Sequence, residues 1–177
     1  MQLIEAVPNL SAGPNTPALQ AVLRALAATR GACVLHVDGN DDANRTVITL
    51  AGTPENVLKS LRVLFKTAAQ QIDMRLHHGA HPRLGAVDVC PLVPLQNCTL
   101  GQAARYAREL AQFVGEELQI PIYLYEENAR TTERIPSVVT LFPVNRFSTG
   151  LSNLLLYTYE TILLNLALRM RFDGGIL

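Results

Sequence analysis

Three stretches of this chain each begin at a threonine that can cap a helix, and each continues with apolar residues at helical spacing. Thr16 and Thr53 are each followed by a proline, which favours the first position of a helix. Thr99 with Gln102 forms a capping-box pattern. These patterns predict helices over residues 17–30, 54–72 and 100–118, each with one face to bury.

Short apolar runs alternate with these helices and predict strands. They are Leu3–Val7, Cys33–Val37, Thr46–Leu50, Asp88–Leu95 and Pro121–Tyr125. Pro8-Asn9 halts the first run, and the polar stretch between the second and third predicts a hairpin with a wide loop. Two prolines confine the fourth run to an edge or to strand ends. The order β-α-β-β-α-β, then α-β, predicts an α+β fold: a ferredoxin-like sandwich with an extra αβ unit and helices on one face of an antiparallel or mixed sheet.

Composition narrows the class of protein. A chain of 177 residues that is 49% hydrophobic can bury one sizeable core, with an appendage. Its 15 basic and 15 acidic side chains cancel and no Lys/Arg run stands out, so we do not expect a nucleic-acid partner. Three cysteines without a paired framework, and a start without a secretory pattern, predict a cytoplasmic location.

The pattern changes after Arg134, which predicts a domain over residues 1–134 and a divergent tail over 135–177. In the tail, Leu151–Leu168 is rich in leucine, but Asn153, Glu160 and Asn165 interrupt it. These polar residues make it a marginal membrane span. We therefore expect an amphipathic helix that docks on the domain or on a partner.

Residues 77–91 hold three of the four histidines in a segment that cannot be regular helix. The imidazole pKa lies near neutrality, so histidines on a constrained loop are candidates for proton transfer. Pro82 pushes His81 out of helical geometry, and Gly79 and Gly85 allow the backbone to approach a ligand closely. His81 is therefore the candidate catalytic residue, whereas His77 and His78 are expected to be solvated loop residues.

Two other chemistries fit the same segment less well. His77 and His81 with Asp88 or Cys90 could hold a metal, but the segment is not helical and no second ligand motif completes the set. We therefore expect no metal. Cys90 lies in a strand between Val89 and Pro91, where a small core residue is expected rather than a nucleophile.

Polar residues also stand where the predicted strands end. Asp38 could hold an imidazole in one tautomer or take up a developing positive charge, and Asn44-Arg45 could orient a carboxylate-bearing substrate. The alternative for Asp38 and Asn44 is that they form turns, as Asx residues usually do.

Five ordered blocks, spanning roughly the first 130 positions, together resemble the N-terminal subdomain of glutamate formiminotransferase. The blocks are Val7–Gly13, Val37-Asp38 with Asn44–Val47, Ile72–Met74, His81–Pro91 and Pro121–Tyr125. The resemblance implies a folate enzyme of histidine breakdown that moves a formimino group from N-formimino-L-glutamate to tetrahydrofolate, with no metal. It also implies two ferredoxin-like halves with the substrates in a cleft between them.

The resemblance makes His81 the catalytic residue. Its imidazole would take a proton from the attacking folate nitrogen and return one to the departing glutamate nitrogen. The residues expected to bind or orient folate and substrate are Asn9, Asp38, Asn44, Arg45, Arg83 and Gly85.

No second subdomain is recognisable after Arg134. We therefore expect a second copy of the chain, or a separate chain with the C-terminal subdomain, to complete the cleft, because a solitary half would leave one wall open to water. The alternative is a non-catalytic relative that binds folate or a partner.

Overall fold

The computed structural model describes residues 1–80, 84–125, 128 and 139–140. The chain divides into two units, Met1–Ile122 and Tyr123–Leu177. The first unit holds the sheet, the three helices and the core. The predicted tail, 135–177, lies outside the described residues apart from 139–140.

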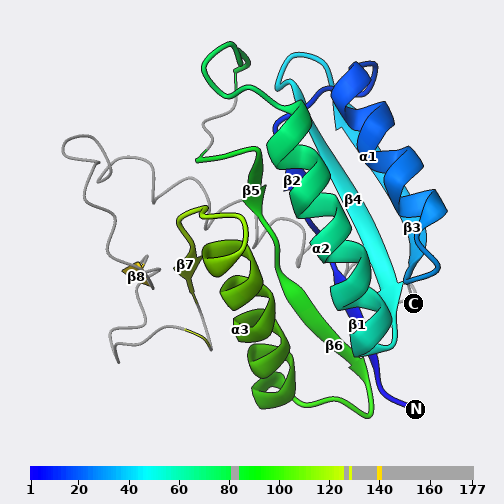
Figure 1. The fold of residues 1–177 in the computed structure, drawn as a ribbon. Coiled ribbons are helices and arrows are strands. Elements are labelled where there is room, and N and C mark those ends of the chain that lie inside the picture. The colour runs from blue at the N-terminus through cyan, green and yellow to red at the C-terminus, as the bar shows by residue number, and fades with distance from the viewer. Residues whose placement is uncertain (81–83, 126–127, 129–138, 141–177) are drawn as a thin grey trace, which may run out of the picture. The chain divides into compact units, whose positions relative to one another are not determined.

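The sheet of the first unit is antiparallel throughout (Figure 1). Its strands are β1 (Leu3–Ala6), β2 (Asn9–Leu10), β3 (Cys33–Asn40), β4 (Arg45–Gly52), β5 (Val87–Val89) and β6 (Leu92–Gln96). Both β1 and β2 pair with β4 on one side, and they pair with β6 and β5, respectively, on the other. β3 pairs with β4. β3 therefore lies at one edge of the sheet, next to β4. β1 and β2 follow one another along the other side of β4, and β6 and β5 form the opposite edge beside them.

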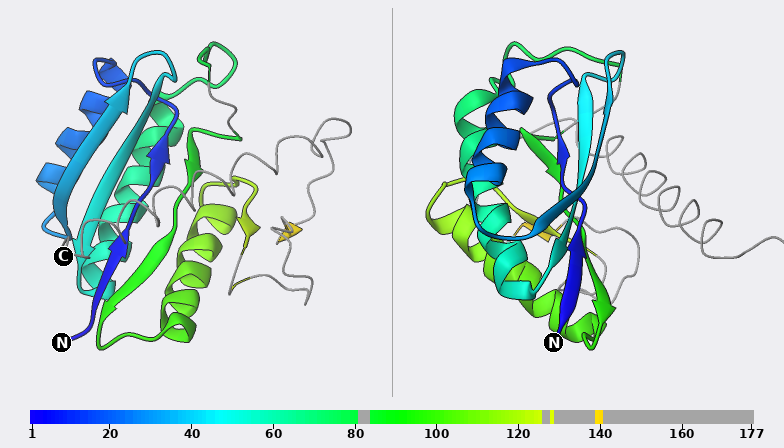
Figure 2. Two further views of the ribbon diagram at one scale, coloured as in Figure 1. Left: turned by 180° about the vertical axis from the view of Figure 1, so that it is seen from behind. Right: turned by 90° about the vertical axis from the view of Figure 1, so that its right-hand side faces the viewer.

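Helices α1 (Pro17–Ala28), α2 (Pro54–Gln71) and α3 (Leu100–Glu116) cover one face of this sheet (Figure 2). Each predicted cap forms. Thr16 Oγ1 accepts from the Leu19 amide at 3.3 Å, and Thr53 Oγ1 accepts from the Asn56 amide at 3.4 Å. Thr99 and Gln102 make the reciprocal capping box. The three helices are confirmed, because local capping and an apolar face act together at each start.

The core lies between the helices and the sheet. Ile48 and Leu50 of β4 and Leu61 and Leu64 of α2 have no solvent exposure. Alternation along the strand sends their neighbours to the opposite face of the sheet. The α+β class is thus confirmed, and the ferredoxin-like name with an extra αβ unit stays a prediction.

The first strand ends before Pro8 as predicted, because β1 covers Leu3–Ala6. Pairing with β4 then resumes, since the Pro8 carbonyl accepts from the Ile48 amide at 3.0 Å and Asn9 lies opposite Val47. One detail of the predicted strands is wrong. The hairpin loop is not wide, because β3 runs to Asn40 and β4 starts at Arg45. Asn40 Oδ1 accepts from the Ala43 amide at 2.8 Å and closes a tight turn.

Two further predicted strands, over 88–95 and 121–125, are observed with different bounds. The proline-containing strand lies at the sheet edge as expected, split into β5 and β6 around Pro91. In the second unit only β7 (Tyr123–Leu124) of the predicted run 121–125 is strand, and it pairs with β8 (Val139–Thr140). No helix among the described residues combines the length and the apolar character that crossing a membrane requires.

Truncating the core should cost far more than truncating the surface. We expect Leu61→Ala to lower the free energy of unfolding by about 2–5 kcal/mol, because the removed methyls leave a cavity under α2. Leu35→Ala on β3, where the side chain is 59% exposed, should change it by less than about 0.5 kcal/mol. Urea unfolding of both variants measures the contrast, and equal losses would contradict the assigned core.

Candidate functional site

Four loops meet at the end of β2 and are joined by hydrogen bonds. They are residues 11–16 after β2, the β3–β4 turn 41–44, the approach to the histidine segment 77–80, and the exit from it 84–86. The Ser11 amide donates to the Ala86 carbonyl at 3.0 Å, and the Ala80 amide donates to the Asp42 carbonyl at 2.9 Å. Segments far apart in the chain are thus held at one end of the sheet.

Asn44 links three of these loops. Its Oδ1 accepts from the Gly13 amide at 2.8 Å, and its Nδ2 donates to the His78 carbonyl at 2.8 Å. Its own carbonyl lies 3.0 Å from His77 Nε2. The backbone has φ 47°, a left-handed value that asparagine tolerates better than most residues. Asn44 is thus a turn former that also contacts the histidine segment, and its role in orienting a substrate stays a prediction.

The loop after β2 packs tightly on its neighbours. Ser11 Oγ donates to the Gly85 carbonyl at 2.8 Å. A Cβ on Gly39 of β3 would lie 2.6 Å from Pro14 Cβ, so this position has to be glycine for the loop to sit against the strand. A Cβ on Gly85 would make only an ordinary contact with the Val87 carbonyl, at 3.5 Å.

Asn9, Arg45 and Asp88 form one buried polar cluster. Asn9 Oδ1 accepts from Arg45 Nε at 3.1 Å and from Arg45 Nη2 at 2.7 Å. Arg45 Nη1 forms an ion pair with Asp88 Oδ2 at 3.1 Å, and the two side chains are 10% and 1% exposed. Their strand neighbours Leu10 and Thr46 are fully buried, so alternation places the cluster on the face of the sheet opposite the helices.

Asp88 also holds the exit from the histidine segment. Its Oδ1 accepts from the Leu84 amide at 2.6 Å. One carboxylate oxygen therefore forms an ion pair with a strand arginine, and the other accepts a hydrogen bond from a loop amide. A charge-assisted hydrogen bond of the second kind is about twice as strong as a neutral one.

The structure brings some of the predicted site residues together and leaves others apart. Asn9 and Arg45 are in contact, and Asn44 directly precedes Arg45 in the chain. Asp38 lies on β3 rather than in a loop, opposite Val47, which in turn lies opposite Asn9. Asp38 and Asn9 therefore lie on the same face of the sheet, at the same level across three strands, but they are separated by β4 and do not touch. His81 and Arg83 lie outside the described residues.

The remaining side chains of the histidine segment differ from one another. His77 is half-buried and bonded to the β3–β4 turn, which differs from the solvated state expected, whereas His78 is exposed. Burial raises the pKa of the Cys90 thiol to about 12, as suits a core residue and not a nucleophile. Within the described part of the chain, no three His, Cys, Asp or Glu side chains are grouped to hold a metal.

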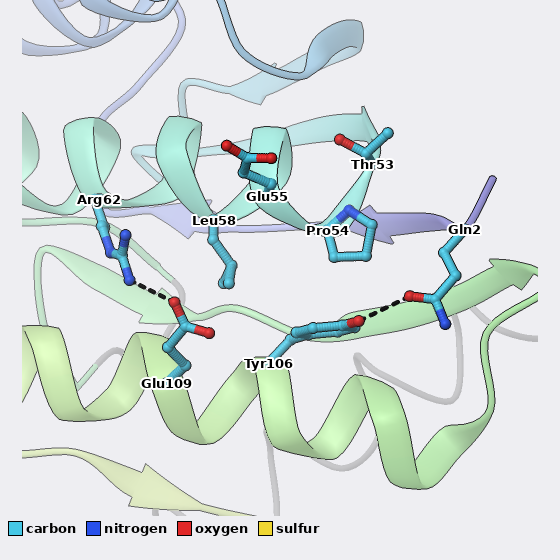
Figure 3. A pocket seen from close by; sticks show the side chains of 8 residues that line it. All are labelled: Gln2, Thr53, Pro54, Glu55, Leu58, Arg62, Tyr106 and Glu109. Carbon is cyan, nitrogen blue, oxygen red and sulfur yellow. Dashed lines mark hydrogen bonds and ion pairs between the residues drawn. The ribbon is translucent and has the colours of Figure 1, made fainter.

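A groove of about 530 Å³ lies on the helical side, between α2 and α3 (Figure 3). Arg62 Nη2 meets Glu109 Oε1 there at 2.6 Å, and the Tyr106 hydroxyl donates to Gln2 Oε1 at 2.8 Å. Both side chains of the Arg62 pair are exposed, so the pair adds little stability. The groove contains none of the predicted site residues.

From the sequence, Ser11 has no expected site role at this end of the sheet, and Asp88 has only that of a possible metal ligand, which was not expected to be used. For Asp88 a signal was present: an acidic residue in the apolar run Val87–Val89 is expected to be buried only with a partner. Ser11 had no such signal, because its bonds depend on tertiary contact.

The fold and this cluster of loops define an α+β domain with a polar site at one end of an antiparallel sheet. Comparison with known proteins then identifies the family. Residues 3–139 match the family described as formiminotransferase domain, N-terminal subdomain. The chain belongs to this family.

Individual relatives agree with this assignment. The chain is 46% identical over 133 residues to a formimidoyltransferase-cyclodeaminase of Sus scrofa, covering 75% of this chain and 25% of that protein. It is 40% identical over 134 residues to a glutamate formimidoyltransferase of Thermoplasma acidophilum, covering 76% and 44%. A glutamate formimidoyltransferase of Streptococcus pyogenes serotype M1 is 35% identical over 133 residues, covering 75% and 44%. The chain therefore matches less than half the length of each of these relatives.

Asp73 lies just before the histidine segment in the sequence, and its contact with Arg75 can be tested by titration. Its carboxylate accepts from the Arg75 side chain and amide, and these hydrogen bonds lower the Asp73 pKa from 3.8 to about 2. Since the folded-state pKa is depressed, the stabilisation is fully present above pH 3.8 and is lost as the pH falls towards 2. Carbon-13 NMR titration should find this midpoint, and Arg75→Ala should raise it towards 3.8. An unchanged midpoint in the variant would contradict the contact.

Two of the three thiols, those of Cys33 and Cys90, should differ in reactivity. Cys33 is exposed, whereas burial of Cys90 leaves almost no thiolate at pH 8. We expect iodoacetamide to label Cys33 and spare Cys90 in the folded protein, and to label both in urea. Mass spectrometry of the peptides measures this, and equal native rates would show that Cys90 is not protected.

Proposed function

We propose that this chain supplies the N-terminal half of an enzyme that transfers a formimino group from N-formimino-L-glutamate to tetrahydrofolate. The observation that carries the proposal is the match to the N-terminal formiminotransferase subdomain over residues 3–139. The convergence of four loops on both flanks of the histidine segment supports it. The proposed products are glutamate and 5-formiminotetrahydrofolate.

His81 is the proposed catalytic residue. As the folate nitrogen attacks the formimino carbon, a new C–N bond forms and the nitrogen must lose its proton, which neutral imidazole accepts. When the C–N bond to glutamate breaks, the imidazolium returns that proton to the departing nitrogen. One imidazole with a pKa near 7 can perform both steps. The two proton transfers and the exchange of one C–N bond for another account for all atoms and electrons, so no redox agent or metal is needed.

The residues proposed to bind or orient tetrahydrofolate and substrate share the end of the sheet or the segment that leads to it. They are Asn9, Asp38, Asn44, Arg45, Arg83 and Gly85. Arg45 already bonds to Asn9 and Asp88, which suits an orienting role. Asp38 is exposed on the same face, where its charge is available to a cationic transition state.

The boundaries of the subdomain and the partner chain belong to the same proposal. We take residues 1–134 as the subdomain and 135–177 as the tail, and we propose that a second copy of this chain or a separate chain with the C-terminal subdomain completes the cleft. The chain covers 25% of the Sus scrofa relative and 44% of the Streptococcus pyogenes relative. The reduced, exposed Cys33 fits a cytoplasmic location. The alternative is a non-catalytic relative that binds folate or a partner.

Replacing His81 tests the proposal that this chain is part of an enzyme. We expect His81→Ala to lower kcat by about 100-fold or more, because it removes the acid and base together. His78→Ala, which removes an exposed imidazole of the same segment, is the matched control and should leave kcat within about two-fold. Mass spectrometry of formimino-tetrahydrofolate measures turnover.

The assay also separates the alternatives. Turnover that is equal in His81→Ala and the parent chain would remove His81 from the chemistry. A parent chain that binds tetrahydrofolate, measured by calorimetry, but gives no turnover even with a C-terminal formiminotransferase subdomain added would favour the non-catalytic relative.

A further inference from the structure

Every residue of β3, from Cys33 to Asn40, is exposed. Among the described residues this strand pairs with β4 alone, and the side of β3 away from β4 is therefore an open edge of the sheet (Figure 1). Three of its exposed side chains are large and apolar: Val34 is 37% exposed, Leu35 59% and Val37 36%. A long open edge with apolar side chains is a surface to which a further strand can be added.

The backbone groups of Val37 point to the open edge. Val37 lies opposite Ile48 of β4. The Ile48 amide donates to the Pro8 carbonyl at 3.0 Å, and Pro8 lies between β1 and β2 on the other side of β4. Because both backbone groups of a residue in an antiparallel ladder point to the same side, Val37 and Ile48 form a non-hydrogen-bonded pair. The N–H and C=O of Val37 thus face away from β4, where a further strand would lie.

The side chains beside Val37 are complementary to each other. His36 and Asp38 lie opposite Thr49 and Val47, on the face of the sheet away from the helices, and both are exposed. An imidazole has a ring N–H in either protonation state, and a carboxylate accepts from it. The register of β3 shifts between Val34 and His36, so the regular part of the open edge starts at His36 and includes both groups.

We propose that β3 is an interface at which a second copy of this chain adds its own β3, antiparallel, about a two-fold axis at Val37. The Val37 amide of each copy donates to the Val37 carbonyl of the other. His36 of each copy lies opposite Asp38 of the other, and the symmetry makes this pair twice. Since the Cα atoms of such a non-hydrogen-bonded pair are about 4.5 Å apart, each imidazole reaches the carboxylate that faces it.

Charge selects both this register and this occupant. An axis moved to Asp38 sets two carboxylates opposite each other, and an axis moved to His36 sets two imidazoles opposite each other. Like charges that lie directly opposite on neighbouring strands are destabilising. The axis at Val37 avoids both arrangements and pairs each group with its complement, so the edge fits a second copy of itself.

The inference does not depend on the proposed function. A carboxylate accepts through both oxygens, so Asp38 can bond to His36 of the second copy and keep an oxygen for a substrate. The tests below measure association alone, and they give an answer whether or not the chain shows turnover.

The first test removes the outward backbone donor. Val37→Pro takes away an N–H that does not bond to β4, which an edge strand tolerates, and Val37→Thr keeps this N–H and is the matched control. By sedimentation equilibrium of the full chain, we expect the dimer dissociation constant to rise about ten-fold or more in Val37→Pro and to stay within about three-fold in Val37→Thr. Urea unfolding establishes that both are folded. Equal constants in the two variants would overturn β3 as the interface.

The second test exchanges the charges. His36→Glu sets a carboxylate opposite each Asp38 and should raise the dissociation constant about ten-fold or more. Adding Asp38→Lys to the same chain restores opposite charges and should return the constant to within about three-fold of the parent value. Both positions are exposed, so these variants are expected to fold.

Two results of the second test would contradict the proposal. A double variant that associates no better than His36→Glu would overturn the axis at Val37. A parent chain that is still a monomer at about 1 mM protein would overturn the second copy as the occupant of the edge.

Discussion

The ion pair between Arg45 and Asp88 joins strands that are not neighbours. Asn9 lies on the strand between them and bonds to the same guanidinium, so one cluster connects β4, β2 and β5. Two charges with side-chain exposures of 10% and 1% are costly to desolvate, and the removal of one partner of such a pair typically costs about 3–5 kcal/mol. The loops at this end of the sheet start from these strands, and their placement depends on the cluster.

The helices depend on a different and more local cause. Each capping threonine bonds within its own first turn, and each helix has an apolar face at helical spacing. Both signals can be read along the chain, so the three helices could be predicted with their starts. The return of strand pairing at Asn9 could not, because it depends on β4, whose Ile48 amide donates to the Pro8 carbonyl.

The site, too, has a part that the sequence predicts and a part that only the structure shows. The sequence pointed to Asn9, Asn44 and Arg45 through their residue types and through the family resemblance. It did not reveal that Arg45 and Asp88 pair, since the partners are far apart in the chain and only the sheet brings them together. The narrow β3–β4 turn was likewise missed, because cross-strand pairing extends both strands into polar residues that alone favour a loop.

The sequence by itself determined the α+β class, the helix starts, the edge position of the proline-containing strand and the family, because capping, periodicity and motif spacing are local properties of the chain. Tertiary structure alone decided which polar residues meet. Only packing of the sheet puts Asp88 beside both Arg45 and the Leu84 amide, and Asn44 beside Gly13 and His78. These contacts need backbone segments from distant parts of the chain to be in register, and no local pattern encodes that register.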